Sequence, residues 1–334
     1  MPVPLLQLLR RPPTAQQGPP LPLRPLLRPG HRVVVDGPRL LLERGHRVVL
    51  LEGRAAGLLL PRLLPLLDGS RTVAEIAEAL GPEARPAVEH ALRVLAARRL
   101  LCEGPSSARL PRPLRDTVEL LAADAELSPA LVAERLGSSS VCVVGSSAAA
   151  AAAAELVAAA GVAVARARRW RDARGDVVIA APAPAEAGAI RRLNRRALRR
   201  GVDWLPILPY DGRVAAVGPL IVPRETACAT CYLLRRAAVV DYGDELAVLE
   251  RAPVRTRSVA ALDRLMAELA ALHVLRWLGT RDARLPGTLQ TVELGDGVEI
   301  VRHVVLRVPR CPSCSGLGAV APPLPWHDLP LEAA

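Results

Sequence analysis

The stretch "VCVVGSSAAAAAAAELVAAAGVAVARARR" (residues 141–169) decides the fold. It reads as a buried strand, a turn at Gly145, an alanine-rich helix and a second strand, "VAVARA" (162–167). Nucleotide-binding α/β domains begin in this way. The turn, however, has one glycine where close approach to a phosphate normally needs two or three. Where a ribose-binding acid is expected, there are instead three arginines at and just after the end of the second strand: Arg166, Arg168 and Arg169. The stretch predicts a nucleotide-type fold and leaves nucleotide binding open.

The composition restricts the chemistry. The 334 residues suffice for two or three domains, and 51% of them are hydrophobic, enough for large cores. The net charge of +11 comes from arginine alone, because the chain contains no lysine. This excludes a P-loop lysine, a Schiff-base lysine and lysine-assisted adenylation. The positive charge favours an acidic partner, either a peptide or a nucleic acid.

The N-terminal segment, residues 1–30, is rich in Pro, Leu and Arg. Its prolines interrupt every apolar run, so we expect a loosely ordered arm and no secretory signal. The apolar run at 58–67 is too short and too interrupted to span a bilayer. In a chain without a signal peptide, paired cysteines indicate a metal rather than disulfides. We therefore expect a cytoplasmic protein without a membrane partner.

A first module is expected at residues 31–104. Three short strands precede three helices, an arrangement typical of small winged-helix domains, and Thr72 with Glu75 predicts a capping box. Winged helices often bind DNA, but the third helix lacks the Asn, Gln and Ser side chains that read bases. DNA binding is therefore disfavoured. The expected strands are 32–36, 39–43 and 46–52, and the expected helices are 54–67, 72–80 and 84–99.

Two parts of this module, "LLPLLDGSRTVAEIAEALG" and "ALRVLAARRLL", resemble the PqqD-like peptide recognition element (RRE) of enzymes that modify ribosomally made peptides (RiPPs). The resemblance implies that a leader peptide adds a strand to 46–52 and packs on the third helix, by β-augmentation. The candidate pocket residues, which are equally compatible with an ordinary core, are Val48, Leu50, Val88, Leu92 and Leu95. The arginines that would pair with an acidic leader, or form a solvated face, are Arg47, Arg93, Arg98 and Arg99.

The second module, residues 105–334, alternates strands and helices and predicts a doubly wound α/β sheet. A long helix at 257–278 presents an apolar stripe that favours core packing, with a dimer or partner interface as the alternative. A hairpin at 288–308 turns at Asp296-Gly297. The stripe consists of Val259, Leu262, Leu265, Met266, Leu269 and Leu272. The other elements expected are strands at 140–145, 162–167, 176–182 and within 202–223, and helices at 129–136, 146–160 and 185–201.

Two C-x-x-C pairs predict a metal site formed by Cys228, Cys231, Cys311 and Cys314. Each pair is a two-ligand turn, and two such turns make a tetrahedral thiolate site for Zn²⁺. Four thiolates leave no open coordination position, so the zinc would be structural. The two remaining cysteines lie in apolar contexts and read as buried thiols. No cysteine has a convincing His–Asp partner, so we expect no thiol catalysis.

The strand–turn–helix opening, "GDVVIAAPAP" and "GPLIVPRETACATC…CPSC" together resemble the ThiF fold of ubiquitin-activating-type adenylating enzymes. That resemblance would imply ATP binding, but the nucleotide-type turn (Gly145, Ser146 and Ser147) lacks the extra glycines. Ala180-Ala181-Pro182 replaces the family's aspartate motif, and the family's lysine is missing. We therefore expect no ATP and no catalytic residue, with the two serines as a weak anion site at most.

The combination resembles the ocin-ThiF-like family, the leader peptide-binding F proteins of thiazole/oxazole-modified microcin (TOMM) biosynthesis. It implies a non-catalytic scaffold that presents a precursor peptide to a separate YcaO cyclodehydratase, which uses ATP to form azolines. A homodimer is compatible with this assignment. Two alternatives stay open: an active ThiF-like enzyme that adenylates a peptide carboxylate, and a winged-helix DNA-binding regulator.

Overall fold

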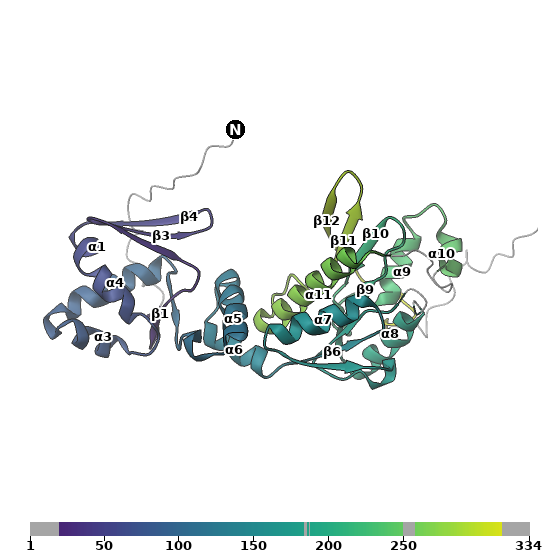
Figure 1. The fold of residues 1–334 in the computed structure, drawn as a ribbon, viewed down its shortest axis with the longest axis horizontal. Helices are drawn as coiled ribbons and strands as arrows, with labels where there is room; N and C mark the ends of the chain where they lie inside the picture. The colour runs from purple at the N-terminus through teal and green to yellow at the C-terminus, as the bar shows by residue number, and fades with distance from the viewer. Residues whose placement is uncertain (1–19, 184–185, 187, 250–257, 316–334) are drawn as a thin grey trace, which may run out of the picture. The chain divides into compact units, whose positions relative to one another are not determined.

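The computed structural model describes residues 20–183, 186, 188–249 and 258–315. The chain divides into two compact units (Figure 1). Unit 1 comprises residues 1–110 and 118–132, and unit 2 comprises residues 111–117 and 133–334. Helix α5 (Arg112–Ala125) therefore contributes to both, and helix α6 (Pro129–Gly137) follows it.

Unit 1 contains an antiparallel three-stranded sheet in the order β2-β3-β4. Gly37 and Gly45 form the turns between strands, each with a positive φ that glycine adopts without strain. Leu41 pairs with Val34 on one side and with Leu50 on the other. The strands are β2 (Arg32–Asp36), β3 (Arg39–Arg44) and β4 (Arg47–Glu52), which confirms the predicted order.

Short helices cover one face of this sheet and enclose the core of unit 1. The predicted capping box is confirmed, because Glu75 N–H donates to Thr72 Oγ1 and Thr72 N–H donates to the Glu75 carboxylate. Leu40, Leu42 and Leu51 point into the core from the sheet. The helical elements are α1 (Arg54–Leu58), α2 (Leu60–Leu63), η1 (Leu64–Leu66), α3 (Val73–Leu80), η2 (Pro82–Ala84) and α4 (Arg85–Ala97).

A second, two-stranded sheet joins the ends of unit 1. Strand β1 (Pro25–Leu27) pairs antiparallel with β5 (Leu101–Glu103). The sequence pattern placed residues 25–27 in the arm. The strand forms because Leu26 is buried, and the pairing holds it there. Residues 1–19, the rest of the predicted arm, lie outside the described part of the chain.

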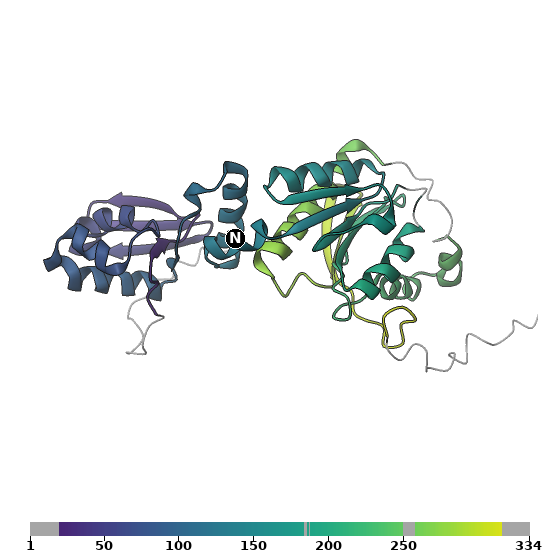
Figure 2. The same ribbon diagram turned by 90° about the horizontal axis from the view of Figure 1, so that it is seen from below.

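Unit 2 is built on a seven-stranded sheet in the order β12-β11-β10-β9-β8-β6-β7. Strands β6 to β9 run parallel, which confirms the predicted doubly wound arrangement. Figure 2 shows helices on both faces of the sheet. The parallel strands are β6 (Ser140–Val144), β7 (Ala163–Ala167), β8 (Val177–Ala180) and β9 (Asp203–Leu208). The antiparallel strands are β10 (Val214–Val217), β11 (Thr288–Leu294) and β12 (Val298–Val304).

Each face of the sheet has its own helical layer. Helices α7 and α11 pack together on one face, and α8 packs on the other face over Val144 and Val178. The helices of unit 2 are α7 (Ala148–Ala159), α8 (Ala189–Arg200), α9 (Ala229–Ala237), α10 (Gly243–Leu249) and α11 (Ala260–Thr280). No helix among the described residues is long and apolar enough to cross a membrane.

The apolar stripe predicted for α11 is only partly right. Leu262 and Met266 are buried as expected, but Val259 is 63% exposed and Leu272 is 54% exposed. The buried side of α11 is instead rich in small residues. The alanine-rich α7 packs against α11, and a close approach of two helices favours alanine over leucine at the contact.

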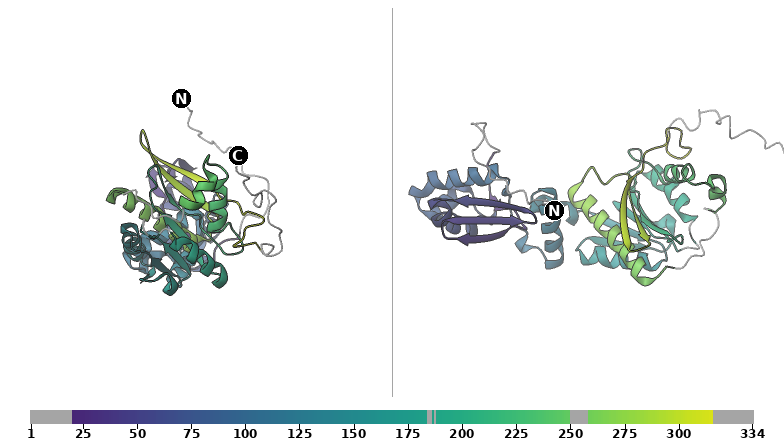
Figure 3. Two further views of the ribbon diagram at one scale, coloured as in Figure 1. Left: turned by 90° about the vertical axis from the view of Figure 1, so that its right-hand side faces the viewer. Right: turned by 90° about the horizontal axis from the view of Figure 1, so that it is seen from above.

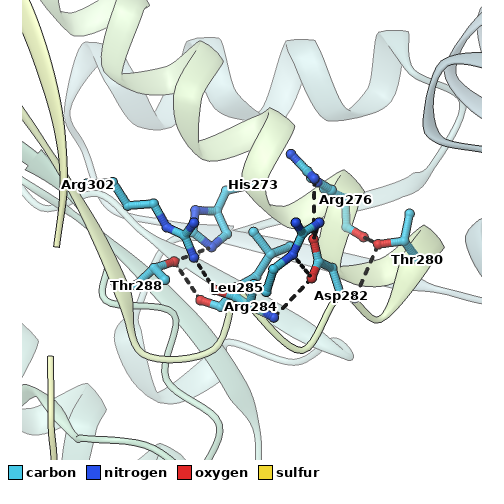
Figure 4. A network of polar contacts seen from close by, with 8 residues as sticks. All are labelled: His273, Arg276, Thr280, Asp282, Arg284, Leu285, Thr288 and Arg302. Atoms are coloured by element: carbon cyan, nitrogen blue, oxygen red, sulfur yellow. Dashed lines mark hydrogen bonds and ion pairs between the residues drawn. The ribbon is translucent and has the colours of Figure 1, made fainter. Parts of the chain in front are cut away.

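A polar network ties the end of α11 to the hairpin β11–β12 (Figure 4). The Asp282 carboxylate accepts from Arg276 at 3.3 Å and from Arg284 at 2.8 Å. The guanidinium of Arg302, on β12, donates to the Arg284 carbonyl. The Arg284 and Arg276 guanidinium groups hold the pKa of Asp282 down at about 2. The carboxylate therefore stays charged over the whole physiological range.

His273, on the buried side of α11, gives this junction a pH dependence. Its Nε2 lies 3.4 Å from Thr288 Oγ1, and burial lowers its pKa from 6.5 to about 4. The unfolded chain therefore takes up a proton before the folded chain does, so stability should fall as the pH drops from 6.5 to 4. We expect a loss of about 2–3 kcal/mol across this window, reduced in His273→Gln. Urea unfolding at several pH values checks this, and a loss equally steep in the variant would contradict it.

Candidate functional site

The nucleotide-type turn lies where this kind of sheet usually binds a ligand. Strand β6 has β7 on one side and β8 on the other, so the strand order reverses at β6. Ligands of such sheets bind at the carboxyl ends of the strands beside the reversal. Gly145 follows β6 directly and has a φ of 130°. A Cβ at Gly145 would lie 2.0 Å from the Ala181 carbonyl oxygen. The glycine is thus needed for packing against the end of β8, independently of any phosphate.

The two serines of the turn are already engaged within the chain. Ser147 Oγ accepts from Ala150 N–H at 3.1 Å as the N-cap of α7, and donates to the Ala181 carbonyl at 2.8 Å. Ser146 Oγ donates to Glu186 Oε2 at 3.0 Å, and the same carboxylate accepts from Ala183 N–H at 3.2 Å. A carboxylate therefore lies beside the start of α7, where the positive end of the helix would attract a bound phosphate.

The neighbouring strand ends do not supply nucleotide-binding groups either. Arg168 and Arg169 follow β7 and are exposed, as the sequence placed them. Ala180 and Ala181 are buried at the end of β8 and carry no carboxylate that would hold a metal ion. Among the described residues, this part of unit 2 thus has the position of a nucleotide site, with arginines and alanines at the strand ends in place of carboxylates.

Gly145→Ala tests the packing role of this glycine. The added methyl group clashes with the Ala181 carbonyl and the φ disfavours any other residue, so we expect unit 2 to lose about 2–5 kcal/mol of stability. Gly137→Ala is the matched control, because Gly137 ends α6 with nothing within 4 Å of the added Cβ. The control should be neutral or slightly stabilising. Similar melting temperatures for the two variants would show that the clash is absent.

The strongest chemical feature of unit 2 is the thiol cluster, formed by the four predicted cysteines. Cys228 precedes α9, Cys231 lies on its first turn, and the loop after β12 brings in Cys311 and Cys314. Their Sγ atoms all lie within 4.8 Å of one another. The separations include 3.7 Å for Cys228–Cys311 and 3.5 Å for Cys231–Cys314. The structure therefore brings together the two predicted C-x-x-C pairs.

Surrounding groups orient the thiol cluster. The Asn194 side chain of α8 accepts from Ala229 N–H at 3.1 Å and fixes the start of α9. Val308 N–H points at Cys231 Sγ at 3.3 Å. The hydroxyl groups of Thr230 and Ser313 share a hydrogen bond of 2.7 Å, which links the two C-x-x-C turns. Sequence patterns gave no signal for this supporting shell, because its members are distant in the chain.

The cluster fits a structural metal ion. Three of its four thiols are buried, and the hydrogen bond with the neighbouring Cys231 lowers the pKa of Cys228, which favours a thiolate there. Tetrahedral sulfur ligation selects thiophilic metals and leaves no position for a substrate. A metal at this position would fasten the chain after β12 to α9.

A further feature, missed from sequence, is a cavity of about 520 Å³ between α8, α9, α10 and the β9–β10 turn. Arg191 and Arg213 contribute positive charge to its lining, and Arg236 bonds Asp211 at 3.0 Å within it. The only sequence signal was the basic outer face of α8. The cavity thus combines a mostly apolar lining with positive charge.

In unit 1, the proposed peptide site is the free edge of β4. Strand β4 pairs with β3 alone within the described residues. Val48 and Leu50 project from the sheet face away from the core, 57% and 43% exposed. Figure 3 looks onto this sheet in its right-hand view. Arg47 and Arg93 are also exposed. An added strand on this edge would meet two apolar side chains and the Arg47 cation.

The other predicted groove residues lie elsewhere. Val88, Leu92 and Leu95 are fully buried in the core of unit 1, so they do not line a surface groove. Periodicity gives a helix the same apolar face for either role. Arg99 lies beyond the end of α4 with a positive φ, and its guanidinium pairs with Glu126 at 3.4 Å. It belongs to the α4–β5 junction.

Comparison with known proteins gives structural matches without a sequence match. No protein-family profile and no curated protein sequence matches the chain. The fold resembles those of TruD and MccB. The heterocyclase TruD has a TM-score of 0.68 and 22% identity, covering 88% of this chain and 43% of its own. A heterocyclase solved in complex with substrate and cofactor has a TM-score of 0.69 and 20% identity, and the match covers 87% of this chain and 39% of the heterocyclase chain.

E. coli MccB, solved with AMPCPP and MccA, has a TM-score of 0.60 and 15% identity. The match covers 87% of this chain and 99% of MccB. The chain thus spans about two fifths of the heterocyclase chains and nearly all of MccB. These likenesses confirm the predicted fold over most of the chain.

Proposed function

We propose that this chain is a leader-binding scaffold that presents a ribosomal precursor peptide to a separate YcaO-type, ATP-dependent cyclodehydratase. The observation that carries the proposal is the free edge of β4, a strand that pairs with β3 alone among the described residues and bears the exposed Val48 and Leu50. Main-chain hydrogen bonds to the edge would supply affinity, and the two side chains would supply specificity. Tethering the leader would make the meeting of core peptide and active site effectively intramolecular.

The nucleotide-type turn favours a scaffold over an adenylating enzyme. Both serines are engaged within the chain, and the Glu186 carboxylate lies where phosphate charge would have to enter. Bringing a triphosphate there would set like charges side by side. MccB, which the match covers to 99%, was solved with AMPCPP and MccA, so the competing function, adenylation of a peptide carboxylate, stays open. The fold alone does not choose between them.

We further propose zinc as the metal of the thiol cluster. The four sulfur atoms match a tetrathiolate site, and zinc forms such sites for structural purposes. A bound ion would cross-link α9 and the segment after β12, and its role would be structural. The leader peptide that we expect is acidic, in keeping with the net charge of +11 and with the exposed Arg47 and Arg93.

Reconstitution tests the proposal. The precursor peptide and a YcaO partner are incubated with ATP, with and without this chain, and azoline formation is followed by mass spectrometry as loss of water. We expect conversion to rise at least about tenfold with the chain present, because of the effective concentration that it provides. The chain alone should catalyse no ATP–pyrophosphate exchange. Exchange that depends on a peptide carboxylate would contradict the scaffold and establish the adenylating enzyme.

A further inference from the structure

Strand β12 leaves an apolar strand edge uncovered. It pairs with β11 alone, and in the part of the chain that the structure describes no strand lies on its other side. Its Val298, Ile300 and Val304 side chains are 63%, 47% and 64% exposed. Figure 1 shows the hairpin projecting past α11. Proteins normally shorten, charge or cover such edges, since their free N–H and C=O groups capture other strands. We therefore expect another strand to pair with this edge.

The sequence of β12, VEIVRHV, is self-complementary about its central residue, Val301. Two copies that run antiparallel around a twofold axis at Val301 pair along the entire strand. Val298 then lies opposite Val304 of the second copy, and Glu299 lies opposite His303. Odd-numbered residues meet odd-numbered residues, so each side chain stays on its own face of the joined sheet.

The neighbouring registers are worse. A shift by two residues in one direction places Glu299 opposite Val301, and a shift in the other direction places two Arg302 residues opposite each other. Both shifts also leave strand ends unpaired. The register centred on Val301 also places Ile300 opposite Arg302, but it pairs the whole strand, sets Glu299 opposite His303 and puts no like charges opposite each other.

Charges within the chain point to the same register. Glu299 lies opposite Glu293 of β11, an unfavourable pair of like charges. Glu293 has an ion pair with Arg213 at 3.7 Å, and the described residues provide none for Glu299. His303 Nε2 bonds Thr291 Oγ1 at 3.1 Å, which leaves Nδ1 for a group outside the chain. A second copy supplies each glutamate with a histidine.

We propose that β12 pairs with β12 of a second copy, antiparallel about Val301, and joins the two seven-stranded sheets of a homodimer into one. The contact is isologous, so one twofold axis closes it and no filament grows. The surface differs from the α11 stripe first considered for a dimer. The inference is independent of the proposed function, because it uses only residues of unit 2.

Sedimentation equilibrium tests the dimer. We expect wild type to be a dimer and both Glu299→Arg and His303→Glu to raise the dimer dissociation constant at least tenfold, since each change acts twice across the axis. The decisive experiment mixes the two variants. The arginine introduced in one chain then faces the glutamate introduced in the other, and the unchanged Glu299 faces the unchanged His303. A heterodimer should therefore form where neither variant dimerises alone.

Glu155→Arg is the matched control, an equal charge reversal at an exposed position of α7. It should leave the dimer intact. Circular dichroism melts show whether each variant is folded. A monomeric wild type, or a dimer that neither variant weakens, would overturn the proposal. So would a monomer whose β12 amides become protected only when leader peptide is added, since the edge would then belong to the peptide.

Discussion

Cys311→Ser is expected to release the metal that we propose for the thiol cluster and to unfold the segment after β12. The four Sγ atoms lie within 4.8 Å of one another, and no other side chain is seen among the described residues to replace a lost sulfur. In small zinc domains the metal contributes on the order of 10 kcal/mol to folding. That equals the total stability of many domains. Metal analysis and thermal unfolding, with and without a chelator, measure the effect.

Cys102→Ala is the matched control for this prediction. Cys102 is a buried thiol of unit 1, and burial raises its pKa to about 11, so it stays protonated. The variant should keep one equivalent of zinc and lose only the stability of a small buried side chain, about 1 kcal/mol. Finding clearly less than one equivalent of tightly held metal in the folded wild type would remove the zinc assignment.

Leu50→Glu is expected to weaken leader binding at least about tenfold while leaving unit 1 folded. Leu50 is 43% exposed on β4, so the fold tolerates a carboxylate there. A leader strand on the β4 edge would bury that carboxylate against apolar side chains, and an acidic leader would also repel it. Fluorescence anisotropy with a labelled leader peptide measures the loss.

Leu120→Glu controls for the charge itself. Leu120 is 60% exposed on α5 and does not belong to the β4 strand, so this variant should bind the leader like wild type. Leu92→Glu is different, because Leu92 is fully buried and the new carboxylate would have no partner. It should destabilise unit 1 by several kcal/mol and lose binding through unfolding. If wild type and Leu50→Glu bound the leader peptide with equal affinity, the β4 edge would be excluded as the binding site.

The features predictable from sequence were those fixed by local pattern. The strand alternation in β2 to β4, the capping box at Thr72 and the strand–turn–helix at Gly145 all depend on residues close in the chain. The thiol cluster was predictable for another reason. Each C-x-x-C pair sets two ligands locally, and four-coordination then demands that the two pairs meet.

The features that sequence missed depend on distant partners. Strand β1 forms because β5 is there to pair with it. Val88 and Leu92 were candidates for a groove, yet periodicity cannot separate a groove wall from a core wall. The contact of the Glu186 carboxylate with Ser146 was likewise not predictable, because the two residues are far apart in the sequence and meet only in the fold.

Hydrogen exchange with and without the leader peptide tests leader capture by β-augmentation most directly. An added strand would give hydrogen-bond partners to the free edge of β4, and its amides would exchange more slowly. We predict protection at Arg47–Glu52 on leader binding, without protection at the turn around Gly145. Protection centred on the turn of unit 2, with β4 unchanged, would contradict the account.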